Sequence, residues 1–250
     1  MNISKLQYDN RTILTPSRDS FVAFDIPHVY HVTTSGSHGT VTATPSEGVN
    51  GTVVTLSNTP DSGYIFSSYT VTGATLYNTN KFVINGSDVN VVGNFTKPAY
   101  KRYLWKFTGA TGRLGWKQFQ IAAIKVNDIS LPYTYITSGI SAGSTWSDSS
   151  PGNFVDSNES NKWGGGTTAS GTIDGWYIFD LPSAVIPTKY SLKTGNDTNY
   201  EDRNPRNGML YGSLGTPTTT SDSSWVLLDS RALNLPRSNL VWTSYTLNKV

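Results

Sequence analysis

The chain has 250 residues, of which 14% are charged, and its formal net charge is +2. This even balance is not typical of a protein that binds nucleic acid or an acidic membrane surface. The absence of cysteine excludes disulfide bonds, thiolate metal sites and thiol catalysis. No apolar stretch is long enough to span a bilayer, and residues 1–16 lack the apolar core of a secretory signal.

The composition favours short strands joined by tight turns. Thr, Tyr and Trp pack well on pleated surfaces, while Gly and Asn readily adopt the positive φ angles of turns. The length allows two compact domains, or one large β domain with an appendage. We therefore predict an all-β protein with a small antiparallel β domain followed by a jelly-roll β-sandwich.

Residues 1–28 form a mixed leader with two strand-like runs, Arg11–Leu14 and Phe21–Ile26. Pro16 and Pro27 are expected to interrupt them, because proline lacks a donor for the β-ladder. The run Lys5–Thr15 resembles the start of many phage structural proteins, which implies a segment that docks onto other virion proteins. The alternative is an N-terminal edge strand without special meaning.

Residues 29–97 alternate between apolar and polar positions, with turn signals such as Asn85-Gly86-Ser87 between the runs. This pattern predicts a small sheet with one buried face. The expected strands are Tyr30–Thr34, Thr40–Thr44, Thr52–Ser57, Ser68–Thr72, Lys81–Ile84 and Val89–Phe95. The segments Gly51–Leu56, Gly63–Phe66 and Asp88–Phe95 resemble the internalin B-type bacterial repeat. The resemblance implies a spacer or adhesive module without an active site.

Lys97-Pro98-Ala99 reads as a domain boundary, because proline ends the preceding strand and all tryptophans lie after it. Residues 98–250 contain no run with helical periodicity, helix formers and caps. The strands expected there are Tyr103–Thr108, Gln118–Val126, Gly175–Asp180, Lys189–Thr194, Met209–Ser213, Trp225–Asp229 and Trp242–Leu247. A jelly-roll sandwich would bury both apolar faces of such strands.

Residues 98–250 also carry motifs similar to those of the discoidin, or coagulation factor type C, family. The motifs are Ser150–Trp163, Trp176–Leu181, Asp202–Pro205, Leu210–Ser213 and Trp225–Asp229. Arg102–Phe107 and Phe119–Ile124 resemble a pair found at the family's C-terminus, which implies a circularly permuted order. The resemblance implies a galactose-binding-like sandwich that binds carbohydrate or surfaces, with Trp163, Trp176 and Trp225 in its core.

The loop at 150–163 suggests a possible calcium site. Carboxylate, amide and carbonyl oxygens are the ligands that Ca²⁺ takes in proteins. Carried over by position from the discoidin resemblance, Asp156, Asn158 and Asn161 would offer these oxygens. Two departures weaken the match, because Ser157 replaces the family's glycine and Ala123 replaces an acidic residue. The alternative is a turn ordered by Asx hydrogen bonds alone.

Several aromatic residues fall in predicted loops, where an exposed ring can stack on the apolar face of a sugar. They are Trp146, Trp116, Tyr133, Tyr135 and Tyr200. Trp146 is the first choice for a carbohydrate contact because it lies nearest the possible calcium loop, followed by Tyr200, Trp116 and Tyr135. The alternative for Trp146 is an ordinary anchor of its loop.

The sequence offers little for catalysis. His28 and His31, three residues apart on a strand, would point to opposite faces and would not bind one metal ion together. Carboxylates that could serve a glycosidase are present, without any pattern that pairs them across a cleft. They are Asp148, Asp156, Glu159, Glu201 and Asp202. Gly164–Gly166 precedes no helix and is expected to be a flexible turn. We expect the protein not to be an enzyme.

The favoured interpretation is a phage structural protein, of the decoration, fibre or tail type, that displays a domain binding bacterial or mucosal glycans. Its partners would be other virion proteins and those glycans, with self-association left open, and without nucleic acid or membrane insertion. One alternative is a virion cement protein that binds no glycan. The other is an adhesin on a bacterial cell surface, or a binding module cut from a glycosidase.

Overall fold

The structure, a computed structural model, describes residues 12–17, 20–197 and 203–248. The predicted all-β fold is confirmed, since the described residues form strands and two short 3₁₀ segments and no α-helix. Within them, no helix has the length and apolar character needed to cross a membrane. The chain divides into two compact units, Met1–Lys97 and Pro98–Val250, which are described separately.

The first strands of the N-terminal unit form a hairpin of β1 (Thr12–Ser17) and β2 (Ser20–Asp25). Pro16 was expected to interrupt the first strand, and this prediction is wrong. It lies within β1, opposite Phe21. A two-stranded sheet has only edge strands, and an edge strand tolerates a residue without an N–H. The part of the predicted docking segment before Thr12 lies outside the described residues.

The rest of the N-terminal unit consists of two four-stranded sheets, ordered β5-β3-β10-β7 and β4-β6-β9-β8. Their strands are β3 (Tyr30–Gly36), β4 (Gly39–Thr44), β5 (Glu47–Gly48), β6 (Val53–Pro60), β7 (Ile65–Thr72), β8 (Leu76–Asn78), β9 (Lys81–Val83) and β10 (Val89–Thr96). Fully buried Val54, Phe82 and Val91 belong to the core of this unit. Strands β3 and β10 run parallel, against the expected antiparallel sheet. A parallel pair needs a long crossover, and here residues 37–88 supply it.

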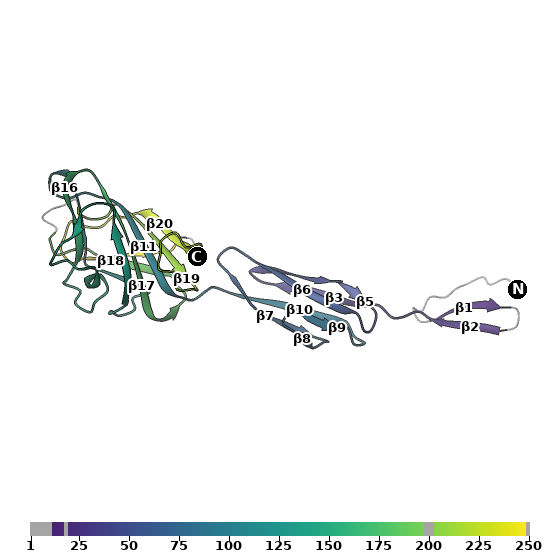
Figure 1. Ribbon diagram of the computed structural model, residues 1–250. Coiled ribbons are helices and arrows are strands. Elements are labelled where there is room, and N and C mark those ends of the chain that lie inside the picture. The colour runs from purple at the N-terminus through teal and green to yellow at the C-terminus, as the bar shows by residue number, and fades with distance from the viewer. Residues whose placement is uncertain (1–11, 18–19, 198–202, 249–250) are drawn as a thin grey trace. The chain divides into compact units, whose positions relative to one another are not determined.

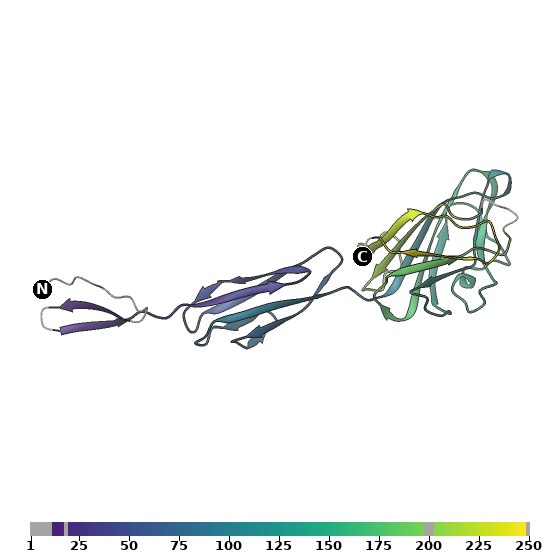
Figure 2. The same cartoon turned by 180° about the vertical axis from the view of Figure 1, so that it is seen from behind.

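The C-terminal unit is a β-sandwich whose strands can be followed in Figures 1 and 2. A five-stranded sheet has the order β14-β17-β11-β19-β20, and two three-stranded sheets have the orders β12-β16-β15 and β13-β18-β21. The strands are β11 (Tyr100–Ala110), β12 (Trp116–Ile121), β13 (Ala123–Val126), β14 (Thr134–Ile140), β15 (Ser144–Thr145), β16 (Trp163–Ser170), β17 (Ile173–Val185), β18 (Lys189–Lys193), β19 (Asn207–Ser213), β20 (Val226–Ala232) and β21 (Trp242–Thr246). The 3₁₀ segments are η1 (Arg113–Gly115) and η2 (Pro151–Phe154).

One aromatic core joins the three sheets of the sandwich. Trp105 and Phe107 from β11 lie in it beside Trp163 from β16 and Phe154 from η2, all at most 1% exposed. The ring centroids of Trp105 and Phe154 are 5.3 Å apart, and those of Phe107 and Trp163 are 5.8 Å apart. Such offset and edge-on aromatic pairs add to the free energy gained by burying their area.

Gly164–Gly166 was expected to be a flexible turn, and this prediction is wrong. These glycines lie in β16, the middle strand of its sheet. The strand needs glycine because its neighbours approach closely. A Cβ atom at Gly165 would lie 2.6 Å from the carbonyl oxygen of Ser144, and one at Gly166 would lie 1.9 Å from that of Lys117.

Two of the three tryptophans expected in the core lie elsewhere. Trp163 is fully buried as predicted, whereas Trp176 and Trp225 are half-buried. Trp225 precedes β20, and its indole N–H donates to the carbonyl oxygen of Thr219 at 2.8 Å. Trp176 alternates along β17 with the buried residues Gly175 and Tyr177, so it projects from the opposite face of the five-stranded sheet.

Candidate functional site

Trp176 lines a cavity on the outer face of the five-stranded sheet. The cavity has a volume of about 320 Å³, which lies at the lower end of the range for small-molecule sites. Its apolar lining residues are Trp176, Met209, Ile140 and Phe107. Trp176 and Met209 each pair with Lys106 across neighbouring strands, so β17 and β19 place their side chains on the same outer face. Ile140 lies opposite Gly175 and packs against the inner core.

Polar groups complete the lining of this cavity, which we call the Trp176 cavity. Asp174 contributes an exposed carboxylate, and its Oδ1 accepts the N–H of Gly109 at 3.0 Å. The hydroxyl of Ser141 accepts the N–H of Asp174 at 3.0 Å, and that of Thr108 accepts from the amide of Asn207 at 3.1 Å. Because both hydroxyl oxygens already accept a hydrogen bond from the protein, each O–H remains able to donate to a ligand.

Lys106 and a loop residue, Thr220, complete the lining of the Trp176 cavity. Lys106 Nζ lies 5.3 Å from the ring centroid of Tyr211 and donates to the carbonyl oxygen of Thr220 at 3.5 Å. Thr220 belongs to the segment Leu214–Trp225, which joins β19 to β20 and which we call the β19–β20 loop. The Trp176 cavity thus combines the Trp176 indole with one acid, one base and several hydroxyls.

The β19–β20 loop is tied to the sheet through a buried arginine. Arg102 Nη1 donates to the carbonyl oxygens of Thr216 at 2.7 Å and Pro217 at 3.2 Å. Its Nε and Nη2 donate to the two carboxylate oxygens of Asp180, at 2.7 Å and 2.9 Å. These hydrogen bonds to Asp180 raise the pKa of Arg102 above its ordinary value, so the guanidinium stays charged.

Trp146, the first choice from the sequence, lies half-buried between β15 and η2. The guanidinium of Arg203 lies 4.7 Å from its ring centroid, and Lys162 Nζ lies 5.9 Å from it. A Cβ atom at Gly164 would lie 3.0 Å from the same ring. These contacts occupy ring surface that a sugar would need, and they favour the alternative role of a loop anchor.

The other predicted aromatic residues do not gather around Trp146. Trp116 pairs with Ser170 at one end of β16. Trp146 lies at the other end of this strand, where its N–H donates to the carbonyl oxygen of Gly164, six residues from Ser170. Six residues of an extended strand span about 20 Å. Tyr135 is 40% exposed on β14, in the other layer, with its ring centroid 5.1 Å from that of Tyr177.

The two remaining predicted aromatic residues are Tyr133 and Tyr200. Tyr133 lies in a loop as predicted, but its ring was expected to be exposed, and this part of the prediction is wrong because it is 6% exposed. Its Oη accepts the N–H of Val126 at 3.2 Å and donates to the carbonyl oxygen of Ile129 at 2.8 Å. Burial raises the pKa of Tyr133 to about 12. Tyr200 lies outside the described residues.

The predicted calcium loop is closed by its own hydrogen bonds. Asp156 Oδ1 accepts the N–H of Asn158 at 2.9 Å, and Asp156 Oδ2 accepts from the amide of Asn161 at 3.0 Å. Asn158 Oδ1 accepts the N–H of Ser160 at 3.2 Å. The bonds to the N–H groups of Asn158 and Ser160 are the Asx turns of the alternative interpretation. They engage Asp156 and Asn158 oxygens that a cation would need.

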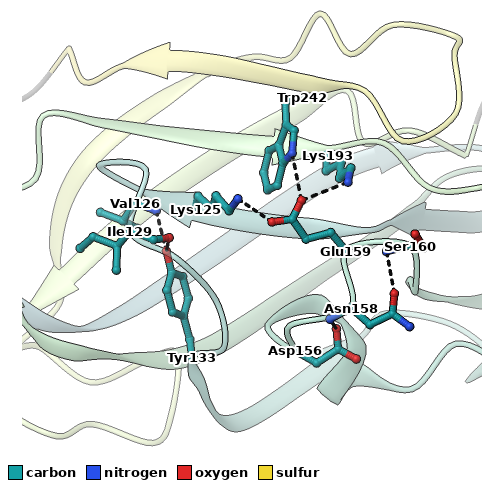
Figure 3. A network of polar contacts seen from close by, with 10 residues as sticks. All are labelled: Lys125, Val126, Ile129, Tyr133, Asp156, Asn158, Glu159, Ser160, Lys193 and Trp242. Atoms are coloured by element: carbon teal, nitrogen blue, oxygen red, sulfur yellow. Dashed lines mark hydrogen bonds and ion pairs between the residues drawn. The ribbon is translucent and has the colours of Figure 1, made fainter.

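Glu159, the other acid of this loop, is directed away from it, as Figure 3 shows. Its carboxylate lies 2.5 Å from Lys125 Nζ and 3.1 Å from Lys193 Nζ, and it accepts the indole N–H of Trp242 at 3.3 Å. The hydrogen bond from Lys125, with that from Lys193, holds the pKa of Glu159 below its ordinary value against the opposing effect of burial. Glu159 therefore fastens the loop to the β13-β18-β21 sheet.

The donor set does not fit a tight calcium site. Calcium takes six to eight oxygen ligands and depends on several carboxylates for affinity. Here Asp156 supplies the carboxylate directed to the loop, while Glu159 is paired with two lysines. Among the described residues, no three His, Cys, Asp or Glu side chains are grouped so that they could hold a metal ion.

The histidines have separate surroundings. His31 Nδ1 lies 3.2 Å from Glu47 Oε2, and the ring of His38 stacks on that of Tyr64 with centroids 4.1 Å apart. His28 meets Tyr30 edge-on. Of the carboxylates considered for a glycosidase, Asp148 accepts from the hydroxyl of Ser149, while Glu201 and Asp202 lie outside the described residues.

Sequence reasoning missed Trp176, Asp174 and Lys106 as site residues. The resemblance of Trp176–Leu181 to a core motif assigned the tryptophan to the interior. A local signal was present, because Trp176 precedes the apolar run Tyr177-Ile178-Phe179, and alternate residues of a strand face opposite sides. Which side faces the core depends on the pairing of distant strands.

Comparison with known proteins identifies one part of the chain. No curated protein and no solved structure matches it. Residues 30–99 match the family described as Divergent InlB B-repeat domain, in the same region as the two four-stranded sheets. The N-terminal unit of this protein therefore contains a divergent InlB B-repeat domain.

Proposed function

We propose that the protein is a non-enzymatic surface protein whose C-terminal sandwich binds carbohydrate in the Trp176 cavity. The observation that carries this proposal is the position of an indole on an outer sheet face, in a cavity of about 320 Å³ that also contains Asp174 and hydroxyl groups. An aromatic ring suits the apolar C–H face of a pyranose, while the carboxylate and hydroxyls suit its hydroxyl groups.

The charge of the cavity favours neutral sugars. Its lining contains one acid, Asp174, and one base, Lys106. The amine of Lys106 already interacts with the carbonyl of Thr220 and the ring of Tyr211. A carboxylate or sulfate on the ligand would be repelled by the carboxylate of Asp174, and Lys106 would offset little of this repulsion.

A surface location is supported by the divergent InlB B-repeat at residues 30–99, since such domains are typical of bacterial surface proteins. The resemblance of residues 5–15 to phage structural proteins favours a virion, to which the leader would attach the chain. A bacterial cell surface is the alternative. Detecting the chain by mass spectrometry in purified virions supports the first setting, and its detection in washed cell envelopes supports the second.

A glycan array with the full chain tests carbohydrate binding. We expect neutral glycans to bind wild-type protein and to lose binding with Trp176→Ala. Two matched variants serve as controls, Trp116→Ala in the same domain and Tyr77→Ala, whose 60% exposed ring lines an open cavity in the repeat. Both should bind as wild type does. Binding that survives Trp176→Ala, or is lost with Tyr77→Ala alone, contradicts the proposed site.

The array also separates adhesion from a purely structural role. A virion cement protein would bind other virion proteins and no glycan. If the correctly folded chain binds no glycan at any tested density, including multivalent display that raises avidity, the structural role replaces the proposal.

A further inference from the structure

We infer that Arg102 is a positioning residue for the Trp176 cavity, because it fixes the β19–β20 loop that brings Thr220 to the cavity wall. This inference rests on the proposed carbohydrate site. Arg102 itself is absent from the lining of the cavity. It would act through the loop, and its substitution changes the identity of no lining residue.

The position of the guanidinium is set by the sheet. Arg102 on β11 pairs directly with Asp180 on β17, and the two side chains form a two-point contact at 2.7 Å and 2.9 Å. Arg102 is 8% exposed. A buried, bidentate arginine has little freedom to move. Its remaining nitrogen, Nη1, is therefore directed at a fixed point, where it meets the carbonyl oxygens of Thr216 and Pro217.

The other contacts of the β19–β20 loop lie within it, at its two ends, or are longer. At the ends, the hydroxyl oxygen of Ser213 on β19 accepts the N–H of Gly215 at 3.1 Å and lies 3.0 Å from Ser224 Oγ. Trp225 Nε1 donates to the carbonyl oxygen of Thr219 at 2.8 Å, and Asp222 Oδ1 accepts the N–H of Ser224 at 2.9 Å, both within the loop. The contact from Lys106 to Thr220 is long, at 3.5 Å. The internal bonds preserve the shape of the loop, and the Ser213 contacts hold its two ends to β19. Arg102 supplies two short contacts from a buried strand position.

A fixed loop means that the cavity wall exists before the ligand arrives. If the loop moves, only a fraction of molecules carries Thr220 in place, and the apparent affinity falls by that fraction. Loss of the anchor should therefore slow association, while the dissociation rate of the formed complex changes little. Direct loss of a ligand contact would instead speed dissociation.

Arg102→Lys tests the inference with the full chain, because lysine keeps the charge beside Asp180 but cannot form the fork and reach both carbonyls. Arg231→Lys is the matched control. Arg231 forms the same fork with Asp229, at 2.5 Å and 2.6 Å, and also donates to the carbonyl oxygen of Thr246. Both variants are compared with wild type by hydrogen–deuterium exchange, and by surface plasmon resonance with a neutral glycan from the array.

We expect Arg102→Lys to speed amide exchange in residues 214–225 and to raise the apparent Kd by about tenfold, mostly through slower association. Arg231→Lys should leave both measurements at wild-type values. Unchanged loop exchange, or wild-type association by Arg102→Lys, overturns the inference. Trp176→Ala distinguishes failure of the proposed carbohydrate site from failure of the positioning role of Arg102. If it binds as wild type does, the proposed site fails, while loop exchange in Arg102→Lys still decides whether the anchor exists.

Discussion

Trp176 and Gly139 lie opposite each other on β17 and β14, and a Cβ atom at Gly139 would lie 2.7 Å from the indole Nε1. Glycine at this position leaves room for the indole beside the neighbouring strand. The indole position therefore depends on a residue that has no side chain of its own.

The first prediction follows from this contact. Gly139→Ala should displace the indole, because the added methyl group is too close to a ring held between strands, and should cost about 1–3 kcal/mol of folding free energy. We expect glycan binding to weaken in the same variant. Gly152→Ala is the control, since its Cβ would meet nothing nearer than Ser150 Oγ at 3.8 Å. If Gly139→Ala and Gly152→Ala bound glycan with the same affinity, glycan binding would not depend on the contact between Gly139 and Trp176.

The second prediction concerns acid stability. The pKa of Glu159 is lower in the folded protein than in the unfolded chain, chiefly because Lys125 hydrogen-bonds to its carboxylate. The stabilisation is therefore present at neutral pH and is lost as the pH falls through the folded-state pKa. Glu159→Gln should lower the free energy of unfolding by about 1 kcal/mol at pH 7.

Urea titrations at several pH values check this prediction. The difference between wild type and Glu159→Gln should shrink as the pH falls below the ordinary range of glutamate, near 4.3. Asp128→Asn, which removes a more exposed ion pair with Lys189, serves for comparison and should change stability less. A difference that stays constant down to the acid transition would mean that the ion pairs of Glu159 do not stabilise the fold.

The third prediction concerns the glycine-rich strand. Gly166 has φ +137, and a Cβ there would lie 1.9 Å from a backbone oxygen. Gly166→Ala should cost about 3 kcal/mol or more, because β12 and β16 must separate. Gly115, with φ +73, meets no atom within 4 Å, so Gly115→Ala should cost only about 1–2 kcal/mol of backbone strain. Thermal unfolding compares the two variants, and Gly166→Ala should have the lower Tm. A lower Tm for Gly115→Ala would contradict the close approach of β12 to Gly166.

The fourth prediction concerns calcium. Because the Asp156 oxygens accept hydrogen bonds from Asn158 and Asn161, we expect millimolar calcium to leave Tm unchanged. A ligand that binds the folded state alone raises Tm with its concentration. A calcium-dependent rise in Tm that disappears in Asp156→Asn would restore the site suggested by the sequence.

The sequence predicted most strands because alternation marks a half-buried strand without knowledge of its partners. Val89–Phe95 and Lys189–Thr194 correspond to β10 (Val89–Thr96) and β18 (Lys189–Lys193). Strand β16 was missed, because Gly164–Gly166 has low strand propensity and is required there by a neighbouring backbone. That requirement arises only from tertiary contacts.

The candidate site was harder to predict than the fold. In β17 both Ile178 and Phe179 are fully buried, so hydrophobicity does not reveal the inner face of that strand. Trp176 was consequently assigned to the core. The contacts of Arg102 with the β19–β20 loop join residues more than 100 positions apart, and no local pattern encodes them.

Nitrogen-15 labelling of the tryptophan indoles tests carbohydrate binding at Trp176 most directly. The seven indole N–H signals can be assigned with single Trp→Phe variants and followed during titration with a neutral glycan. We predict a saturable shift of the Trp176 signal, with those of Trp146 and Trp116 unmoved. Saturation that shifts Trp146 or Trp116 and leaves Trp176 in place would contradict binding in the Trp176 cavity.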